Sequence, residues 1–152
     1  MTRIKNFALL FFLFLLLSCA YEPVLNNKNY EFSLKVIKLD GDQKINSKIV
    51  ENLKYLKEKQ KKYDLIITST KEKKVLSKDS KGDPSIFELL IFVNYIVNKD
   101  GNILFTKNIS RKTTYNNIND KFELENYEKN IITNLAKNIS DKIILSVSEI
   151  HK

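Results

Sequence analysis

The first twenty residues decide how much of this chain is available to fold. Arg3 and Lys5 precede an unbroken apolar run from Phe7 to Leu17, and small residues follow at 18–20. A basic start, a short apolar middle and a small-residue end are typical of a secretory signal peptide. The run of eleven apolar residues is too short to span a bilayer as a helix, which needs about 20. We therefore expect residues 1–18 to be a signal peptide that the mature protein lacks.

The signal ends at the single cysteine of the chain. Leu16-Leu17-Ser18-Cys19 resembles the lipobox of bacterial lipoproteins, in which the peptide is cut before the cysteine, and its thiol and freed amine are acylated. An ordinary signal followed by a chance cysteine would leave one unpaired thiol in an oxidising compartment. The sequence therefore predicts lipidation of Cys19, with palmitate among the chains, and a membrane anchor at that residue. Residues 19–29 then read as a lipidated tether, because Pro23 and three asparagines disfavour regular structure.

Composition limits the size of the folded part and the kind of partner. Removal of 18 of the 152 residues leaves 134, enough for one domain with one core. The formal net charge falls from +8 to +6, because the signal carries two basic residues and no acidic one. A basic composition is typical of nucleic-acid-binding proteins, but an exported protein rarely encounters nucleic acid. We expect no nucleic acid, and anionic lipid or lipopolysaccharide is the more available partner.

The residues that carry most enzyme chemistry are scarce. His151 is the only histidine and lies one residue from the end, and Cys19 is taken by lipid. A catalytic triad, a thiolate or histidine metal site and a glycine-rich phosphate loop are therefore all excluded. We expect no enzyme, no cofactor and no metal. The carboxylate pairs Asp40/Asp42 and Asp79/Asp83 would suit an acid-based hydrolase, but they flank turn glycines, where aspartate is common for backbone reasons.

Hydrophobic periodicity divides the remaining chain into six elements. Alternation of apolar and polar residues predicts strands, whereas apolar spacings of three and four predict helices. In chain order, the sequence predicts a strand over 31–39, a helix over 44–60, strands over 63–76, 87–97 and 103–115, and a helix over 121–149. Gly41, Gly82 and Gly101 fall between these elements, where turns need them.

This order predicts a single small α+β domain, β-α-β-β-β-α, over residues 30–152. The first two strands are expected to be parallel across their helical crossover, and the others antiparallel, giving a four-stranded mixed sheet with two helices packed on one face. The strand over 87–97 is apolar on both sides, which is typical of a central strand. We expect Phe92 and Leu135 to lie in the sheet–helix core or on its covered face, and Tyr127 to belong to the apolar stripe of the last helix.

Several stretches resemble one family of lipoproteins. Tyr21-Glu22-Pro23-Val24-Leu25 after the lipobox cysteine is similar to the opening of LptE, the lipopolysaccharide-assembly lipoprotein. The stretch 87–95 resembles that family's third strand, and Ser110-Arg111 with Tyr115, followed by an acid-rich helix start, resembles its closing half. Two positions depart from the family pattern: Ala20 stands where glycine is usual, and no arginine lies near Ile86.

The resemblance implies a non-enzymatic role. LptE-like proteins sit as a plug inside the outer-membrane β-barrel LptD, support its assembly and bind lipopolysaccharide on its way to the outer leaflet. The resemblance thus implies an LptD-like barrel and lipopolysaccharide as partners, and attachment to the cell outer membrane on its periplasmic side. Alanine rather than aspartate after Cys19 also favours the outer membrane.

Basic residues near loops are the candidates for contact with lipopolysaccharide. Ammonium and guanidinium groups make charge-assisted hydrogen bonds to phosphate, and five such residues are expected to meet at one edge of the sheet: Lys78, Lys81, Arg111, Lys112 and Lys121. In a chain this rich in lysine, each lysine taken alone also fits ordinary solvated surface.

A second function fits the same sequence. An unrelated envelope lipoprotein that binds a soluble periplasmic protein, such as a stress or inhibitor module, would need the same signal and the same fold class, because a fold does not dictate function. Co-purification in detergent discriminates between the two, since only a plug should emerge with an integral β-barrel.

Overall fold

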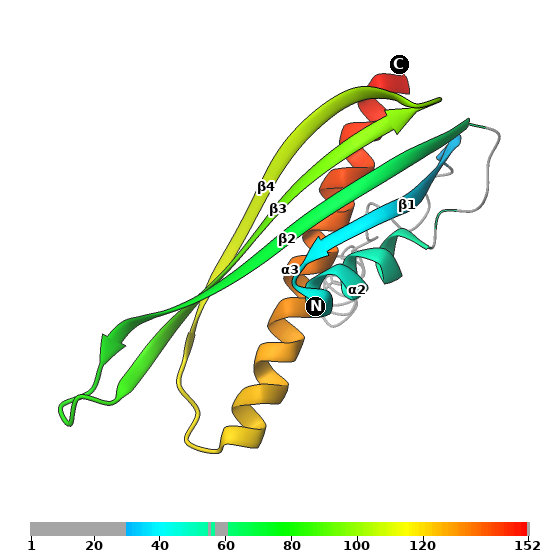
Figure 1. The fold of residues 1–152 in the computed structure, drawn as a ribbon. Coiled ribbons are helices and arrows are strands. Elements are labelled where there is room, and N and C mark those ends of the chain that lie inside the picture. Colours follow the sequence, from blue (N-terminus) through cyan, green and yellow to red (C-terminus); the bar gives the residue numbers. More distant parts are fainter. Residues whose placement is uncertain (1–29, 55, 57–60, 152) are drawn as a thin grey trace, which may run out of the picture.

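The computed structural model describes residues 30–54, 56 and 61–151, and Figure 1 shows their fold. The predicted signal peptide, Cys19 and the tether lie outside the described residues. The elements are β1 (Phe32–Gly41), α2 (Gln43–Leu53), β2 (Lys61–Lys78), β3 (Pro84–Lys99), β4 (Asn102–Asn116), α3 (Lys121–Ser148) and the 3-10 helix η1 (Glu149–His151). The predicted α+β class and element order are confirmed.

The strands form one mixed sheet in the order β1-β2-β3-β4. β1 and β2 are parallel, whereas β2 and β3, and β3 and β4, are antiparallel. The last two strands are joined by Asp100 and Gly101, which have φ angles of 51° and 80°. Positive φ at both positions is what a two-residue type I′ hairpin turn requires. The predicted topology is therefore confirmed.

β3 separates the two faces of the sheet. Its odd-numbered residues from Phe87 to Val97 are at most 8% exposed and belong to the hydrophobic core. α2 and α3 both lie on this side of the sheet (Figure 1). Their buried apolar residues complete the core: Ile45, Ile49 and Leu53 from α2, and Ile132, Leu135, Ala136, Ile139, Ile143, Ile144 and Val147 from α3. Both helices thus cover one face, as the sequence predicts.

The turn from β1 into α2 is held against β2. Gly41 has a φ of +90°, and a Cβ atom at this position would lie 1.8 Å from the carbonyl oxygen of Ser69. Only glycine fits there. Asp42 caps α2, because its Oδ1 accepts hydrogen bonds from two backbone N–H groups of the first turn at 2.9 and 3.1 Å. The buried Ser69 hydroxyl also donates to Oδ1 of Asn46 at 2.8 Å.

α2 ends earlier than the sequence predicts. The expected helix over 44–60 stops at Leu53, and the backbone N–H of Lys54 donates to the carbonyl of Val50 at 3.0 Å as the C-cap. Leu56 packs against the core from a bend rather than from a helical turn. Residues 55 and 57–60 of the predicted range lie outside the described residues. Lys61 and Lys62 already belong to β2.

α3 begins after Asp120, whose Oδ1 accepts from the backbone N–H groups of Phe122 and Glu123 at 2.8 and 3.0 Å. Leu135 is 8% exposed, which confirms its predicted core position. Neither described α-helix is long and apolar enough to cross a membrane.

One position expected in the core is wrong, and one residue of the predicted apolar stripe lies outside the core. Phe92 is 42% exposed, because it is an even-numbered residue of β3 and points away from both helices. Tyr127 is 45% exposed, and its ring lies 6.0 Å from that of Tyr115 near the start of α3. The periodicity predicts which face of α3 is apolar. It does not predict at which residue that face becomes buried, because burial depends on how far α3 extends beyond the core.

Candidate functional site

Three of the five predicted basic residues lie toward one end of the sheet. Lys78 ends β2, Lys81 lies in the turn before β3, and Lys121 begins α3. The loop before α3 is tied to the start of β3, since the backbone N–H of Asn117 donates to the carbonyl of Ser85 at 2.8 Å. All three side chains are exposed. The β2–β3 turn and the start of α3 both lie toward the lower end of the molecule in Figure 1.

Arg111 and Lys112 lie elsewhere and point to opposite faces of the sheet. Arg111 pairs with Ile91, which faces the helices, and Lys112 pairs with Leu90 on the other side. The two residues stand four to five positions before the end of β4, roughly 13–17 Å along the strand. The Nζ atom of Lys112 also lies 2.9 Å from a carboxylate oxygen of Glu88. The five basic residues therefore do not form the single patch expected from the sequence.

The carboxylate pairs that a hydrolase would need are engaged locally. Asp42 caps α2, and its Oδ2 lies 3.3 Å from the Nζ of Lys71. Burial by itself raises the pKa of Asp42, but the hydrogen bonds and the positive charge of Lys71 outweigh it and lower the pKa overall. Asp79 accepts from the backbone N–H groups of Lys81 and Asp83 at 2.8 and 2.9 Å. These are the turn and capping contacts expected of aspartate beside glycine.

The side of the sheet away from α2 and α3, hereafter the open face, carries an apolar strip. No described element covers it. Phe92 pairs across the sheet with Thr70 and Ser110, so polar residues border the strip. Its apolar members are half-buried or exposed: Ile66, Leu90, Phe92, Ile96 and, at the hairpin end, Ile103, which is 66% exposed.

The sequence carries a signal for this surface in the pattern of β3. β3 is apolar on both sides, but the predicted elements include only two helices, and both are needed on one face. A third amphipathic segment that could cover the second face is missing from the predicted elements. An apolar surface left uncovered in this way is the first candidate for a docking site.

A second cluster joins the sheet to α3 on the helix-covered side. The hydroxyl of Tyr115 donates to Oε1 of Glu128 at 2.7 Å, and the ammonium of Lys73 binds the same oxygen. The Lys73 ammonium also lies 4.0 Å from the centroid of the Phe87 ring. Burial raises the pKa of Tyr115, and the adjacent Glu128 carboxylate raises it further. Each charged group in this cluster has a partner within it, so its role is to hold α3 against the sheet.

A pocket of about 510 Å³ opens between β4 and the C-terminal half of α3. It is lined by Arg111 together with Lys107 and Lys142. Lys107 and Lys142 were missed by the sequence reasoning, because they sit on different elements and no local motif connects them. The alternation of 107, 109 and 111 along one side of a strand was the one available signal.

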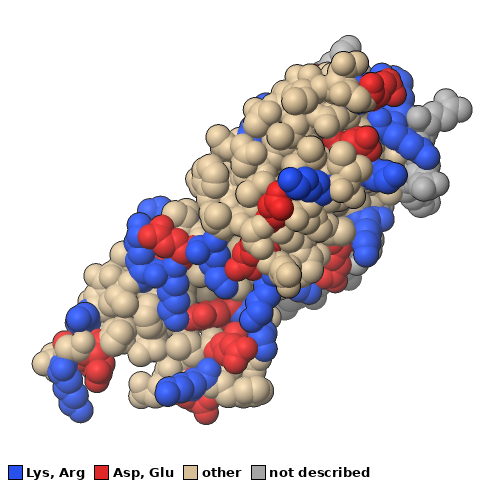
Figure 2. All heavy atoms as spheres, in the orientation of Figure 1, with Lys and Arg blue, Asp and Glu red and all other residues tan. Residues whose placement is uncertain are grey.

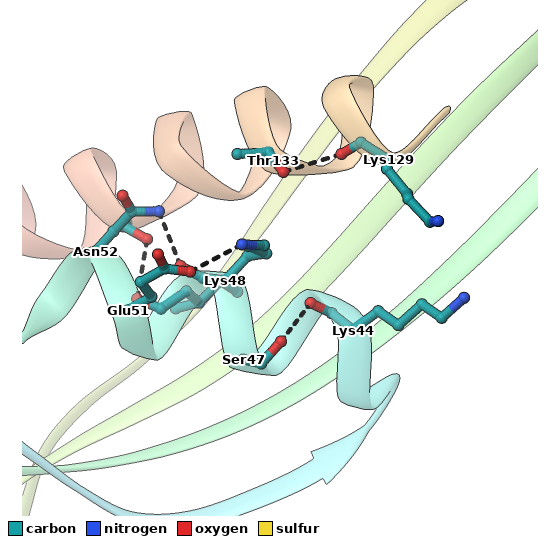
Figure 3. Close-up of polar contacts among 9 residues, drawn as sticks. Lys44, Ser47, Lys48, Glu51, Asn52, Lys129 and Thr133 are labelled. Atoms are coloured by element: carbon teal, nitrogen blue, oxygen red, sulfur yellow. Dashed lines mark hydrogen bonds and ion pairs between the residues drawn. The ribbon is translucent and has the colours of Figure 1, made fainter. Parts of the chain in front are cut away.

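Charges elsewhere are dispersed. Figure 2 shows basic and acidic side chains interspersed, also at the tip of the β2–β3 hairpin. On the outer sides of the helices, polar side chains bond within their own helix (Figure 3): the Ser47 hydroxyl donates to the Lys44 carbonyl at 2.9 Å, and Lys48 lies 2.9 Å from Glu51. The residues drawn there make local helix contacts and do not converge on a common point.

Solved structures share this fold. Rare lipoprotein B from Shewanella oneidensis has a TM-score of 0.59 at 15% identity, covering 77% of this chain and 96% of its own. Lipoprotein B from Nitrosomonas europaea has a TM-score of 0.57 at 16% identity, and the match covers 78% of this chain and 86% of that protein. A lipoprotein from Caulobacter crescentus has a TM-score of 0.56 at 13% identity, and the match covers 76% of this chain and 88% of that protein.

Sequence comparisons add nothing to this likeness. No family model matches the chain, and no curated protein matches it. At identities of 13–16%, the structural similarity establishes the fold alone. These three proteins are bacterial lipoproteins.

Proposed function

We propose that this chain is an outer-membrane lipoprotein on the periplasmic side, anchored through Cys19, that acts as plug and assembly partner of an LptD-like β-barrel and binds lipopolysaccharide. The observation that carries the proposal is the open face, an apolar sheet surface on a fold that bacterial lipoproteins share. The signal, the lipobox and the LptE-like stretches of sequence support it.

The open face supports a stable protein partner. Contiguous exposed apolar surface rimmed by polar residues marks interaction sites in soluble domains. Phe92, at 42% exposure, is a large aromatic near the middle of β3, and buried aromatics are among the residues that dominate interface energies. Docking against the inner wall or loops of a barrel would remove this strip from water.

Exposed lysines at one end of the domain support contact with an anionic glycolipid. Lys78, Lys81 and Lys121 are exposed at the end where the β2–β3 hairpin extends furthest from the core. Their ammonium groups can form charge-assisted hydrogen bonds to phosphate oxygens. The barrel contact and the lipid contact thus fall on separate surfaces and can be tested separately.

The test is affinity purification of the full chain from detergent-solubilised membranes, with identification of co-eluting proteins. We expect a β-barrel to co-elute with the wild type and to be lost with Phe92→Asp. Phe122→Asp is the matched control, because Phe122 is 74% exposed at the start of α3, outside the open face. Melting temperatures of both variants show whether the fold is intact.

Two outcomes contradict the proposal. Co-elution of a soluble periplasmic protein without any barrel would favour the inhibitor or stress-module alternative. Equal barrel recovery with Phe92→Asp and the wild type would show that the open face is not the docking surface.

A further inference from the structure

The pocket between β4 and α3 lies at the free edge of the sheet. β4 is the last strand in the sheet order, so one of its backbone edges is unpaired among the described strands. Lys107 and Arg111 pair with Tyr95 and Ile91, which face the helices, and therefore point to the same side as α3. Lys142 reaches the pocket from α3. Three cations from two elements thus line one concave site of about 510 Å³.

The charges in this pocket are unbalanced. Glu149 is the one carboxylate in its lining, and its Oε2 lies 3.7 Å from the Nζ of Lys107. The Arg111 guanidinium donates to the backbone carbonyl of Ser110 at 2.8 Å. Neither Arg111 nor Lys142 forms an ion pair with any described residue. Two uncompensated positive charges therefore face the same space, one of them half-buried.

The remaining lining is amphipathic. At the pocket floor the buried Tyr95 and Ser146 hydroxyls are hydrogen-bonded to each other at 2.7 Å. Ile109 and Leu145 contribute apolar wall. The Ser146 hydroxyl also donates to the Ile143 carbonyl at 2.8 Å, so the Tyr95 hydroxyl is the donor of the pair and both hydroxyl protons are already engaged. A ligand here therefore meets cations and hydrocarbon, which fits a phosphorylated headgroup that carries an apolar portion.

We propose that this pocket binds a phosphate monoester through Arg111 and Lys142, the phosphate being that of a glycolipid headgroup. A guanidinium presents paired N–H donors that match two phosphate oxygens, and an ammonium adds a point charge. The glycolipid source rests on the function proposed above, whereas the phosphate chemistry does not. A free phosphate monoester is the other source of the same chemistry.

This pocket is distinct from the basic hairpin end, the group formed by Lys78, Lys81 and Lys121 near the β2–β3 turn and the start of α3. Lys121 and Lys142 are 21 residues apart on α3, a distance of about 31 Å along a straight helix. One phosphate group cannot contact both ends. The arrangement therefore assigns Arg111, one of the five residues singled out from the sequence, to a different site from Lys78, Lys81 and Lys121.

Titration of the full lipidated chain in detergent tests the proposal, with diphosphoryl lipid A, its dephosphorylated form and inorganic phosphate as separate probes. We expect Arg111→Gln combined with Lys142→Gln to weaken lipid A binding at least tenfold. Arg111→Lys should give an intermediate loss of lipid A affinity, because lysine keeps the positive charge but lacks the paired N–H donors of a guanidinium. Lys44→Gln with Lys54→Gln, at exposed positions on α2 and its C-cap, is the matched control of equal charge change and should stay within twofold.

The outcomes separate the possible errors. Unchanged lipid A affinity in the Arg111/Lys142 double variant, with an unaltered melting temperature, overturns the site. Equal affinity for lipid A and inorganic phosphate overturns the glycolipid as its source. Failure of the wild type to co-purify with a barrel would remove the proposed plug function while leaving the titration result standing.

Discussion

Tyr115 on β4 donates its hydroxyl to Oε1 of Glu128 on α3 at 2.7 Å, and this bond joins the edge of the sheet to the first half of the long helix. Lys73 from β2 binds the same carboxylate oxygen. One carboxylate thus connects three elements. Burial by itself raises the pKa of Glu128, but the hydrogen bonds and charge of its partners outweigh burial and lower that pKa below its ordinary value of 4.5.

This shift predicts loss of stability in acid. Because the pKa of Glu128 is lower in the folded state, its contribution is complete above pH 4.5 and is lost as pH falls through the folded value. We expect Glu128→Gln to lower the melting temperature at pH 7 and to flatten its fall between neutral pH and about pH 3. Glu125→Gln is the control, since Glu125 forms an exposed ion pair with Lys129 at 3.3 Å. Parallel melting curves for Glu128→Gln and the wild type across this pH range would contradict the prediction.

Asp141 predicts a change of opposite sign. Burial raises its pKa, and the charge of Lys137 offsets this only in part. A raised folded-state pKa means that the ionised carboxylate costs stability at neutral pH, and that this cost disappears as pH falls through the folded value. We expect Asp141→Asn to raise the melting temperature at pH 7 and to have little effect at about pH 3. A lower melting temperature at pH 7 would show that the carboxylate has a favourable partner.

The strands and α3 could be predicted from the sequence because their patterns are long. β3 alternates over 87–97, and α3 runs from Lys121 to Ser148 without glycine or proline. Phe92 was misplaced for a physical reason. An apolar residue on this side of a central strand is buried only if a further layer packs on the sheet, and the alternation of residues along the strand does not show whether such a layer exists. Arg111 and Lys112 were grouped because they are adjacent, yet neighbours in a strand face opposite sides.

Gly41 provides a test of the turn between β1 and α2. A Cβ at this position would lie 1.8 Å from the carbonyl oxygen of Ser69, and the backbone φ is +90°. We expect Gly41→Ala to lower the free energy of unfolding by more than about 2 kcal/mol, since strain and a backbone clash act together. Gly82→Ala has the same positive φ but nothing within 4 Å, so chemical denaturation should show a smaller loss. Equal losses for the two variants would mean that the close approach to Ser69 contributes nothing.

Leu135 tests the packing of α3 on the sheet. It is 8% exposed and belongs to the single described core. Truncation of a buried leucine to alanine costs about 2–5 kcal/mol, so we expect Leu135→Ala to lower the free energy of unfolding within that range. Phe122→Ala, at 74% exposure, serves as the comparison and should change little. An unaltered denaturation midpoint for Leu135→Ala would contradict a packed α3.

Cys19 lies outside the described residues, but its predicted role has a direct test. Acyl burial contributes about 0.8 kcal/mol per methylene, so two or more chains hold a protein firmly on a bilayer. We expect Cys19→Ala to accumulate as an uncleaved or mis-anchored precursor, seen by membrane fractionation and by intact mass. A variant that matures and fractionates like the wild type would rule out the lipoprotein interpretation.

The basic hairpin end gives the last prediction. Lys81 and Lys121 are exposed, and neither forms an ion pair with any described residue. If they meet a polyanionic lipid, that contact should weaken with salt, because exposed charges are screened over about 8–10 Å at physiological ionic strength. We expect Lys81→Ser with Lys121→Ser to reduce the salt dependence of binding to intact lipopolysaccharide while barrel co-purification persists. Since Arg111 and Lys142 are unchanged in this variant, the phosphate affinity of the pocket should be retained. Loss of barrel co-purification would indicate a docking defect, and an unchanged salt dependence would return both lysines to ordinary solvated surface.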